Sequence, residues 1–272
     1  MTPGPADPGT AGAPDIAALR RGAHERAVAR PRRRFAGVVT NSATVHDCPA
    51  LRRYTPDRRH PGAAAVFLHG GYGLFGDLEL QDGWCRQAAE ALGVVVLAVD
   101  YRLAPEARLD DAVVDALAAL ALLAGEGFDR LYLDGDSAGG AVAVLAAART
   151  ADPLAGLLLT NPNLDLSLET YDDDLPGGPG RELSTYAMRA WTGVEPTDAP
   201  RLQRSARGLP PTLVAVGELD SLRPEARELA DACRRDGVPC RLVELPGAEH
   251  GFVGTERAGT VLTEAAAFFG LG

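Results

Sequence analysis

Several features that would point at once to a redox or metal-dependent protein are missing from this chain. It has only four cysteines in 272 residues, without C-x-x-C spacing and without partner histidines. So few cysteines are not enough for a disulfide framework, and their spacing indicates neither a zinc site nor a redox motif. We therefore predict no metal and no organic cofactor.

Long apolar runs and net positive charge are missing too. No apolar run approaches the length of about 18 residues that a membrane-spanning helix needs. Residues 1–6 lack the basic and then apolar plan of a signal peptide. The net charge of −10 disfavours nucleic acid, which binds to a basic face. These absences predict a cytoplasmic protein with no nucleic-acid partner and no membrane association.

The exception to the acidic balance is an arginine-rich stretch within residues 20–34. One interpretation is a solvated helix face followed by a linker. The other is that one or two of these arginines meet an acidic substrate or the acidic loop at residues 172–174. Residues 1–14 show no periodicity and are predicted to be disordered. Asp15 is placed to cap a helix that ends before Pro31.

From residue 64 onward, short apolar runs alternate with helical patterns. The runs are continuously apolar, as in strands that are buried on both faces, so they predict an α/β fold with a mostly parallel sheet and helices on both faces. Residues 163–209 break this rhythm and are interpreted as an insertion above the sheet. The predicted strands are 64–68, 94–99, 131–133, 157–159, 212–216 and 240–245, and the predicted helices are 81–92, 110–124, 138–149, 223–236 and 259–269.

The strongest chemical signal is a G-x-S-x-G motif at residues 135–139, directly between a predicted strand and a predicted helix. In that position the serine occupies a tight strand-to-helix turn, which requires small neighbours on both sides. Gly135, Gly139 and Gly140 supply them. Ser137 is therefore the candidate nucleophile.

A serine hydroxyl needs a base to remove its proton and an acid to orient that base. In folds with this motif the chain order is serine, then acid, then histidine. His250 is the only histidine after Ser137, and Asp220 follows the predicted strand 212–216. We predict Asp220 as the acid, with Glu218 as the weaker candidate. All three loops would meet at the carboxyl edge of the sheet.

Acyl transfer also needs donors for the negatively charged oxygen of the intermediate, and these are commonly backbone N–H groups. Residues 69–73 (HGGYG) follow the first predicted strand, where such a loop is expected. We predict an oxyanion hole formed by the N–H groups of Gly71, Tyr72 and Ala138. His69 is expected to brace the loop, because it precedes the serine and so stands in the wrong order for a base.

These motifs occur together with others along the chain: residues 69–71 (HGG), 100–106 (DYRLAPE), 135–140 (GDSAGG), Asp220 and residues 250–252 (HGF). In this order they resemble the hormone-sensitive lipase-like family of bacterial esterases over about residues 37–270. The resemblance implies the α/β-hydrolase fold with a small helical cap, and it implies that Glu106 braces the oxyanion loop from below as a buried carboxylate. The implied division is cap segments at 15–36 and 163–209 and a catalytic domain at 37–162 and 210–272.

The chain departs from this family at Tyr72, which stands in place of the third glycine. The H-G-G-Y form is similar to that of arylformamidases. If the backbone of Tyr72 donates to the oxyanion, its side chain is free to point into the acyl pocket or toward the cap, and a purely structural role under the cap is the alternative. With Tyr72, the candidate pocket residues are Phe75, Tyr186 and Trp191.

Together these residues predict a serine hydrolase that cleaves carboxylic esters with small to medium acyl groups through an acyl-enzyme on Ser137. The alternatives are an arylformamidase-like amidase, and an acyltransferase or cyclase in which an amine or alcohol replaces water. The expected partner is a small-molecule ester or amide. The sequence does not set the oligomeric state, for which a homodimer is one option.

Overall fold

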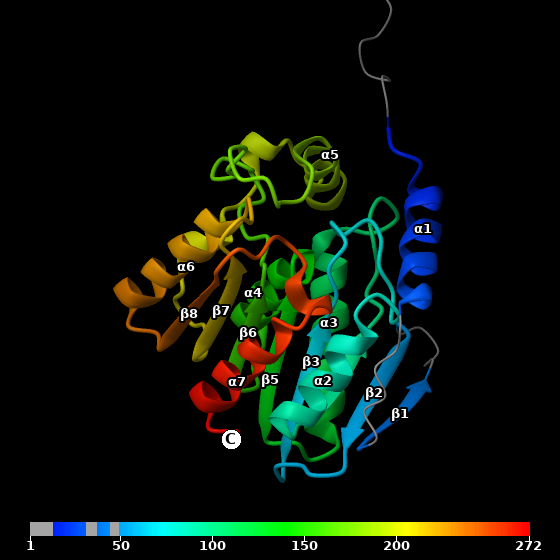
Figure 1. Cartoon of the computed structure of the whole chain (residues 1–272), viewed down its shortest axis with the longest axis vertical. Coiled ribbons are helices and arrows are strands. Elements are labelled where there is room, and N and C mark those ends of the chain that lie inside the picture. Colours follow the sequence, from blue (N-terminus) through cyan, green and yellow to red (C-terminus); the bar gives the residue numbers. More distant parts are fainter. Residues whose placement is uncertain (1–12, 31–36, 44–48) are drawn as a thin grey trace, which may run out of the picture.

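An eight-stranded sheet forms the centre of the molecule (Figure 1). The computed structural model describes residues 13–30, 37–43 and 49–272. The strand order is β1-β2-β4-β3-β5-β6-β7-β8. From β4 to β8 all neighbours are parallel, while β2 pairs antiparallel with both β1 and β4. The predicted α/β-hydrolase fold is confirmed.

All the predicted strands and helices are present among the described residues, and the sequence missed the antiparallel pair β1 and β2, the elements inside the insertion and a 3-10 turn at Phe252–Gly254. Most of the segment predicted to be disordered, and the arginines at 32–34, lie outside the described residues. The strands are β1 (Val38–Ala43), β2 (Leu51–Pro56), β3 (Ala63–Leu68), β4 (Val95–Val99), β5 (Arg130–Asp136), β6 (Leu154–Thr160), β7 (Thr212–Gly217) and β8 (Cys240–Leu245). The α-helices are α1 (Ile16–Ala29), α2 (Asp82–Leu92), α3 (Leu109–Gly125), α4 (Ala138–Arg149), α5 (Arg181–Thr192), α6 (Arg223–Asp236) and α7 (Ala258–Phe269).

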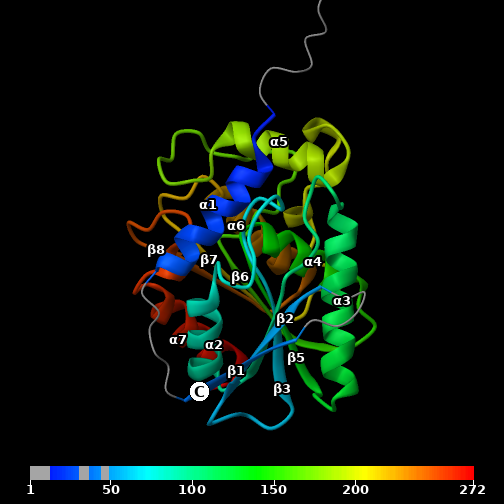
Figure 2. The same ribbon diagram turned by 90° about the vertical axis from the view of Figure 1, so that its right-hand side faces the viewer.

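The insertion at residues 163–209 lies beyond one end of the sheet, where both views show α5 above the strands (Figures 1 and 2). It holds α5 and two short 3-10 turns, Pro196–Asp198 and Leu202–Arg204. Helix α1 begins as expected, because the Asp15 side chain accepts a hydrogen bond from the Ala18 N–H at 2.9 Å. It then lies beside the loop that follows β3.

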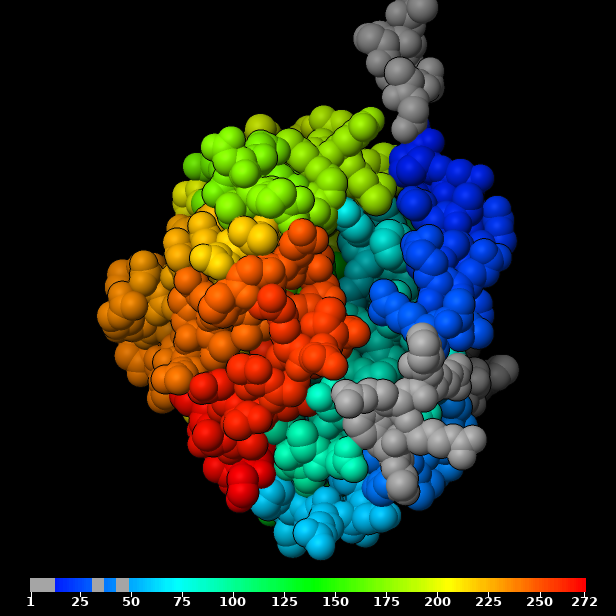
Figure 3. Space-filling model, viewed as in Figure 1, coloured from blue at the N-terminus to red at the C-terminus, as the bar shows by residue number. Residues whose placement is uncertain are grey.

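The surface is hollowed between the start of α2 and the residues that follow His250 (Figure 3). This cavity of about 560 Å³ is lined by residues 79–84, Gln87 and residues 251–256, with Ala27 and Arg30 of the N-terminal segment on its far side. Within the part of the chain that the structure describes, no helix is both long and apolar enough to cross a membrane.

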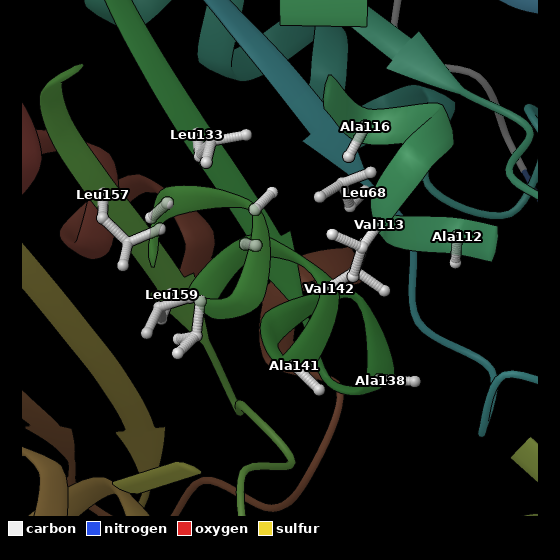
Figure 4. Close-up of a cluster of buried hydrophobic side chains, with 14 of the residues drawn as sticks. Leu68, Ala112, Val113, Ala116, Leu133, Ala138, Ala141, Val142, Leu157 and Leu159 are labelled. Carbon is white, nitrogen blue, oxygen red and sulfur yellow. The ribbon is translucent and has the colours of Figure 1, made fainter. Parts of the chain in front are cut away.

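Two apolar cores hold the sheet between its helices. One lies under α3, α4 and α6, and Figure 4 shows part of it, with Leu68, Leu133 and Leu159 of three neighbouring strands facing side chains of α3 and α4. The other lies under α2 and α7. Strand β3 is buried along its whole length, which explains why its sequence is apolar without alternation. The rigid sheet between these cores positions the loops described next.

Candidate active site

Ser137 sits in the turn between β5 and α4, with a φ of 52° that non-glycine residues rarely adopt. The turn closes only because its neighbours lack side chains. A Cβ on Gly135 would lie 2.5 Å from the Gly139 carbonyl oxygen, and one on Gly139 would lie 2.1 Å from the Leu68 carbonyl oxygen. The packing thus holds the serine backbone in a strained conformation of the kind that is found at functional sites.

His250 and Asp220 complete one hydrogen-bonded line with Ser137. The His250 Nε2 lies 3.0 Å from the Ser137 Oγ. The His250 Nδ1 lies 2.9 Å from an oxygen of Asp220, which is fully buried. The other oxygen of Asp220 accepts the Leu222 N–H at 2.9 Å, so this carboxylate is fixed. Glu218 instead accepts the Gly247 N–H at 2.7 Å and takes no part in the line.

The charges around His250 favour its protonated form. Burial lowers the pKa of the imidazole, but Asp220 raises it through charge and hydrogen bonding, and Asp136 and Glu225 add to this, so the net shift is upward. A base whose pKa lies above its ordinary value accepts the serine proton more readily, provided that the pH keeps it neutral beforehand.

The insertion contacts both loops of this line through its backbone. The His250 N–H donates to the Gly177 carbonyl at 2.6 Å, and the Gly177 N–H donates to the Leu219 carbonyl at 3.0 Å. The Asp172 N–H donates to the Ser221 carbonyl at 3.0 Å. Residues 172–177 therefore fix the acid and base loops relative to each other.

The loop after β3 presents unused backbone donors beside the serine. Among the described residues, the N–H groups of Gly71, Tyr72 and Ala138 donate to no protein acceptor. Tyr72 has a φ of 62°, so the chain turns sharply there. A Cβ on Gly70 would lie 3.1 Å from the Ser137 Cβ, which shows how closely this loop approaches the nucleophile.

His69 braces this loop from within the core, in the position expected for it. Its Nδ1 lies 2.7 Å from the Gly70 carbonyl oxygen, its ring stacks on Tyr101 at 4.3 Å, and its own carbonyl accepts the Tyr101 hydroxyl at 2.7 Å. Burial lowers the pKa of the His69 imidazole. The neutral ring therefore donates from Nδ1 to the carbonyl, and the imidazole that lies within hydrogen-bonding distance of the Ser137 Oγ is that of His250.

Glu106 differs from the expectation, because 64% of its side chain is exposed. It forms an ion pair with Arg20 of α1 at 2.7 Å. Arg20 also donates to the carbonyl oxygens of Leu74 and Ala104, each at 2.9 Å. The brace on the loop is thus Arg20, and Glu106 holds the arginine rather than the loop. Of the two interpretations of the arginine-rich stretch, the one with a specific acidic partner applies to Arg20. That partner is Glu106 and not the acidic loop at residues 172–174.

That acidic loop pairs within the insertion. Asp173 forms an ion pair at 2.7 Å with Arg181 at the start of α5. Among the residues that the structure describes, Asp173 therefore has its partner within the insertion.

The four candidate pocket residues pack at the junction of the loop and the insertion. The Tyr72 hydroxyl accepts the Gly180 N–H at 3.0 Å, and its ring lies 5.6 Å from that of Phe75. Tyr186 is half-buried against the same core. Trp191 differs from the expectation of a pocket wall, because it is fully buried and packs on Gly73, where a Cβ would lie 2.5 Å from its ring. Of the two directions open to the Tyr72 side chain, its hydroxyl takes the one toward the insertion, where it meets Gly180.

Two polar residues behind the serine were not predicted to matter. Asp136 is buried and accepts hydrogen bonds from Thr160 at 2.7 Å and from Asn161 at 3.3 Å. Its second oxygen accepts from the Gln81 amide. Asp136 lies inside the G-x-S-x-G motif and could have been noticed there. Nothing in the sequence marks Gln81, because its role depends on tertiary contacts alone.

A serine, a histidine and an aspartate in one line at the carboxyl edge of a parallel sheet, facing free N–H groups, have the geometry of a serine hydrolase. A family model described as α/β hydrolase fold matches residues 65–254, and the chain belongs to this family. It is 32% identical to Esterase LipI of Mycobacterium tuberculosis over 74% of this chain and 68% of that protein. It is also 32% identical to an ethyl acetate hydrolase of Pseudomonas putida over 81% of this chain and 75% of that protein.

Among solved structures, a hormone-sensitive lipase from a metagenome library superposes with a TM-score of 0.82 at 25% sequence identity. The match covers 95% of this chain and 93% of that one. The resemblance to hormone-sensitive lipase-like esterases and the predicted class, an esterase-type hydrolase, are therefore confirmed.

Proposed function

We propose that the chain is a serine esterase that works through an acyl-enzyme. The Ser137 Oγ attacks the ester carbonyl carbon while His250 Nε2 takes its proton, and Asp220 stabilises the imidazolium that forms. The carbonyl oxygen becomes negative and is bound by the N–H groups of Gly71 and Tyr72. His250 then protonates the departing alcohol, and water repeats the sequence to release the acid.

The observation that carries this proposal is the line from Asp220 to His250 to Ser137, with 2.9 Å and 3.0 Å between its polar atoms. It supports general-base activation of the serine, because both distances lie within hydrogen-bonding reach. The unused N–H groups beside it, including that of Ala138, supply the second requirement of acyl transfer.

The contacts of Tyr72 favour a small to medium ester over a formanilide. The side chain that suggested the amidase accepts the Gly180 N–H and packs on Phe75, so its hydroxyl is directed toward the insertion, where it can donate only to a group that reaches that junction. The similar Pseudomonas putida protein is named for a small ester, ethyl acetate. The acyltransferase alternative, the homodimer and the cytoplasmic location stay predictions.

The test is a product panel analysed by mass spectrometry. We expect p-nitrophenyl acetate and butyrate to be hydrolysed with a higher kcat/KM than the octanoate, and formanilide to be left intact. An added amine should yield no N-acyl product. Preferred turnover of formanilide would assign an amidase, and an N-acyl product would assign an acyltransferase. The Ser137→Ala protein is the control for uncatalysed hydrolysis.

A further inference from the structure

We propose that Gln81 is a positioning residue that ties the oxyanion loop to the carboxylate next to the nucleophile. The inference rests on the proposed function, because it concerns the loop that would bind the oxyanion. Gln81 is the N-cap residue of α2, but its side chain makes no capping hydrogen bond to that helix and is available for other contacts.

The Gln81 amide joins a group that can only donate a hydrogen bond to a group that can only accept one. Its Oε1 accepts the Gly70 N–H at 2.9 Å, and its Nε2 donates to the carboxylate of Asp136. A backbone N–H can only donate and a carboxylate can only accept. The orientation of the amide is therefore fixed by chemistry, and a side chain without both functions cannot replace it.

The far end of this bridge is buried and hydrogen-bonded on both carboxylate oxygens. Asp136 is buried in the turn directly before Ser137, and its second oxygen is held by Thr160 and Asn161 at the end of β6. Through Gln81, the Gly70 N–H is thus held in place relative to the same strands that position the nucleophile.

The near end of the bridge fixes the N-terminal side of Gly70, and His69 fixes the C-terminal side, which carries the first predicted donor. Gln81 holds the Gly70 N–H, while the Gly70 carbonyl accepts from His69 at 2.7 Å. That carbonyl belongs to the same peptide plane as the Gly71 N–H, so fixing it aims the donor. Hydrogen-bond donors stabilise the transition state most when they are already in position as the negative charge develops. Loss of the bridge should therefore weaken stabilisation of the transition state more than substrate binding.

The direct test compares Gln81→Met with Gln87→Met. Both side chains line the same cavity and have the same length, but only Gln81 contacts the loop. We expect Gln81→Met to lower kcat by about 10- to 100-fold with KM within about threefold, and to raise the Ki of a trifluoromethyl ketone by the same factor. Gln87→Met should stay within about twofold. Each kcat is calculated per active site, with the active sites counted by titration with a fluorophosphonate. Misfolded protein therefore does not lower the measured kcat.

The second variant, Gln81→Glu, provides a pH signature. The introduced carboxyl can still donate to Asp136 while it is neutral, whereas its charged form repels Asp136, so the ratio of variant to wild-type kcat should rise as the pH falls from 9 to 6. Three titratable side chains line the same small cavity as the amide: His69, Asp77 and Cys85. Asp136, which faces the amide, also interacts by charge with His250, Asp134 and Tyr101. Burial lowers the pKa of His69 and raises that of Cys85, which keeps both neutral in this range. These neighbours are the same in the wild type and in both variants, so their own titration is common to all three proteins.

Unchanged kcat and Ki per titrated site in Gln81→Met would overturn the proposal, as would a ratio for Gln81→Glu that is near one at every pH. If Gln81→Met does not fold, the pH profile of Gln81→Glu decides alone. Failure of the wild-type Ser137 to react with the fluorophosphonate would instead overturn the proposed function.

Discussion

The nucleophile, base and acid are positioned differently from the oxyanion loop that faces them. Ser137, Asp220 and His250 each follow a parallel strand by one to five residues, so the sheet itself brings them together. The loop at residues 69–76 is held by His69 and Tyr101 of the motifs and also from outside them, by Arg20 of α1, by Gln81 and by the Tyr72 contact with Gly180.

This difference separates the parts of the site that the local sequence determines from those that depend on tertiary contacts between distant segments. Substitution of Ser137, Asp220 or His250 should abolish the chemistry. Damage to the supports of the loop should lower the rate while the serine still reacts with small covalent inhibitors, because the nucleophile and base remain in place.

The largest expected effect comes from the three residues themselves. Ser137→Ala, His250→Ala and Asp220→Asn should each lower kcat by about 10⁴-fold or more, and the combined variant should be no worse than the worst single one. Steady-state kinetics on p-nitrophenyl butyrate measures this. Glu218→Gln is the matched control and should cost far less. The reverse order of the two acids would transfer the role to Glu218.

A smaller effect is expected from Arg20→Met. The guanidinium donates to two carbonyl oxygens that frame the loop, so its loss should lower kcat/KM by about tenfold, as expected for charged hydrogen bonds worth about 1.5–3 kcal/mol. Arg21→Met, on the exposed side of the same helix, should leave the rate unchanged. Equal losses in both variants would show that the helix matters only as a whole.

The Tyr72 contact should affect discrimination more than rate. In Tyr72→Phe the exposed Gly180 N–H loses its protein acceptor to water, which loosens the junction of loop and insertion by about 0.5–1.5 kcal/mol. We expect the ratio of kcat/KM between butyrate and octanoate esters to change a few-fold, and Tyr72→Gly to change it further. A uniform loss on all esters would leave Tyr72 with a purely structural role.

The smallest effect on activity is expected at Asp134, which is buried beside Trp84 and accepts its indole N–H at 2.8 Å. Burial raises the pKa of this carboxyl to about 8. A folded-state pKa above the unfolded value means that stability is lost as the pH rises between those two values, by at most about 1.4 kcal/mol per pH unit. Asp134→Asn should therefore unfold at a higher temperature than the wild type at pH 8, with a smaller difference at pH 5. Thermal unfolding at both pH values measures this, and a constant difference would contradict it.

The sequence predicted what depends on short-range pattern. Continuous apolar runs indicated the buried strands, and a glycine-flanked serine in a strand-to-helix turn indicated the nucleophile. It could not predict β1, at the sheet edge, or its neighbour β2, because these strands carry polar residues such as Arg52 and Arg53 in place of a continuous apolar run. Nor could it predict that Arg20 would hold the loop in place of Glu106, since the two residues are far apart in the sequence and meet only in the fold.

The central claim, that Ser137 forms the covalent intermediate, is tested most directly by labelling the intact protein with a fluorophosphonate and locating the adduct by peptide mass spectrometry. We predict one adduct, on Ser137, with loss of esterase activity in proportion to labelling and no adduct in Ser137→Ala. An adduct on another serine, or a Ser137→Ala protein that retains full activity, would contradict the account.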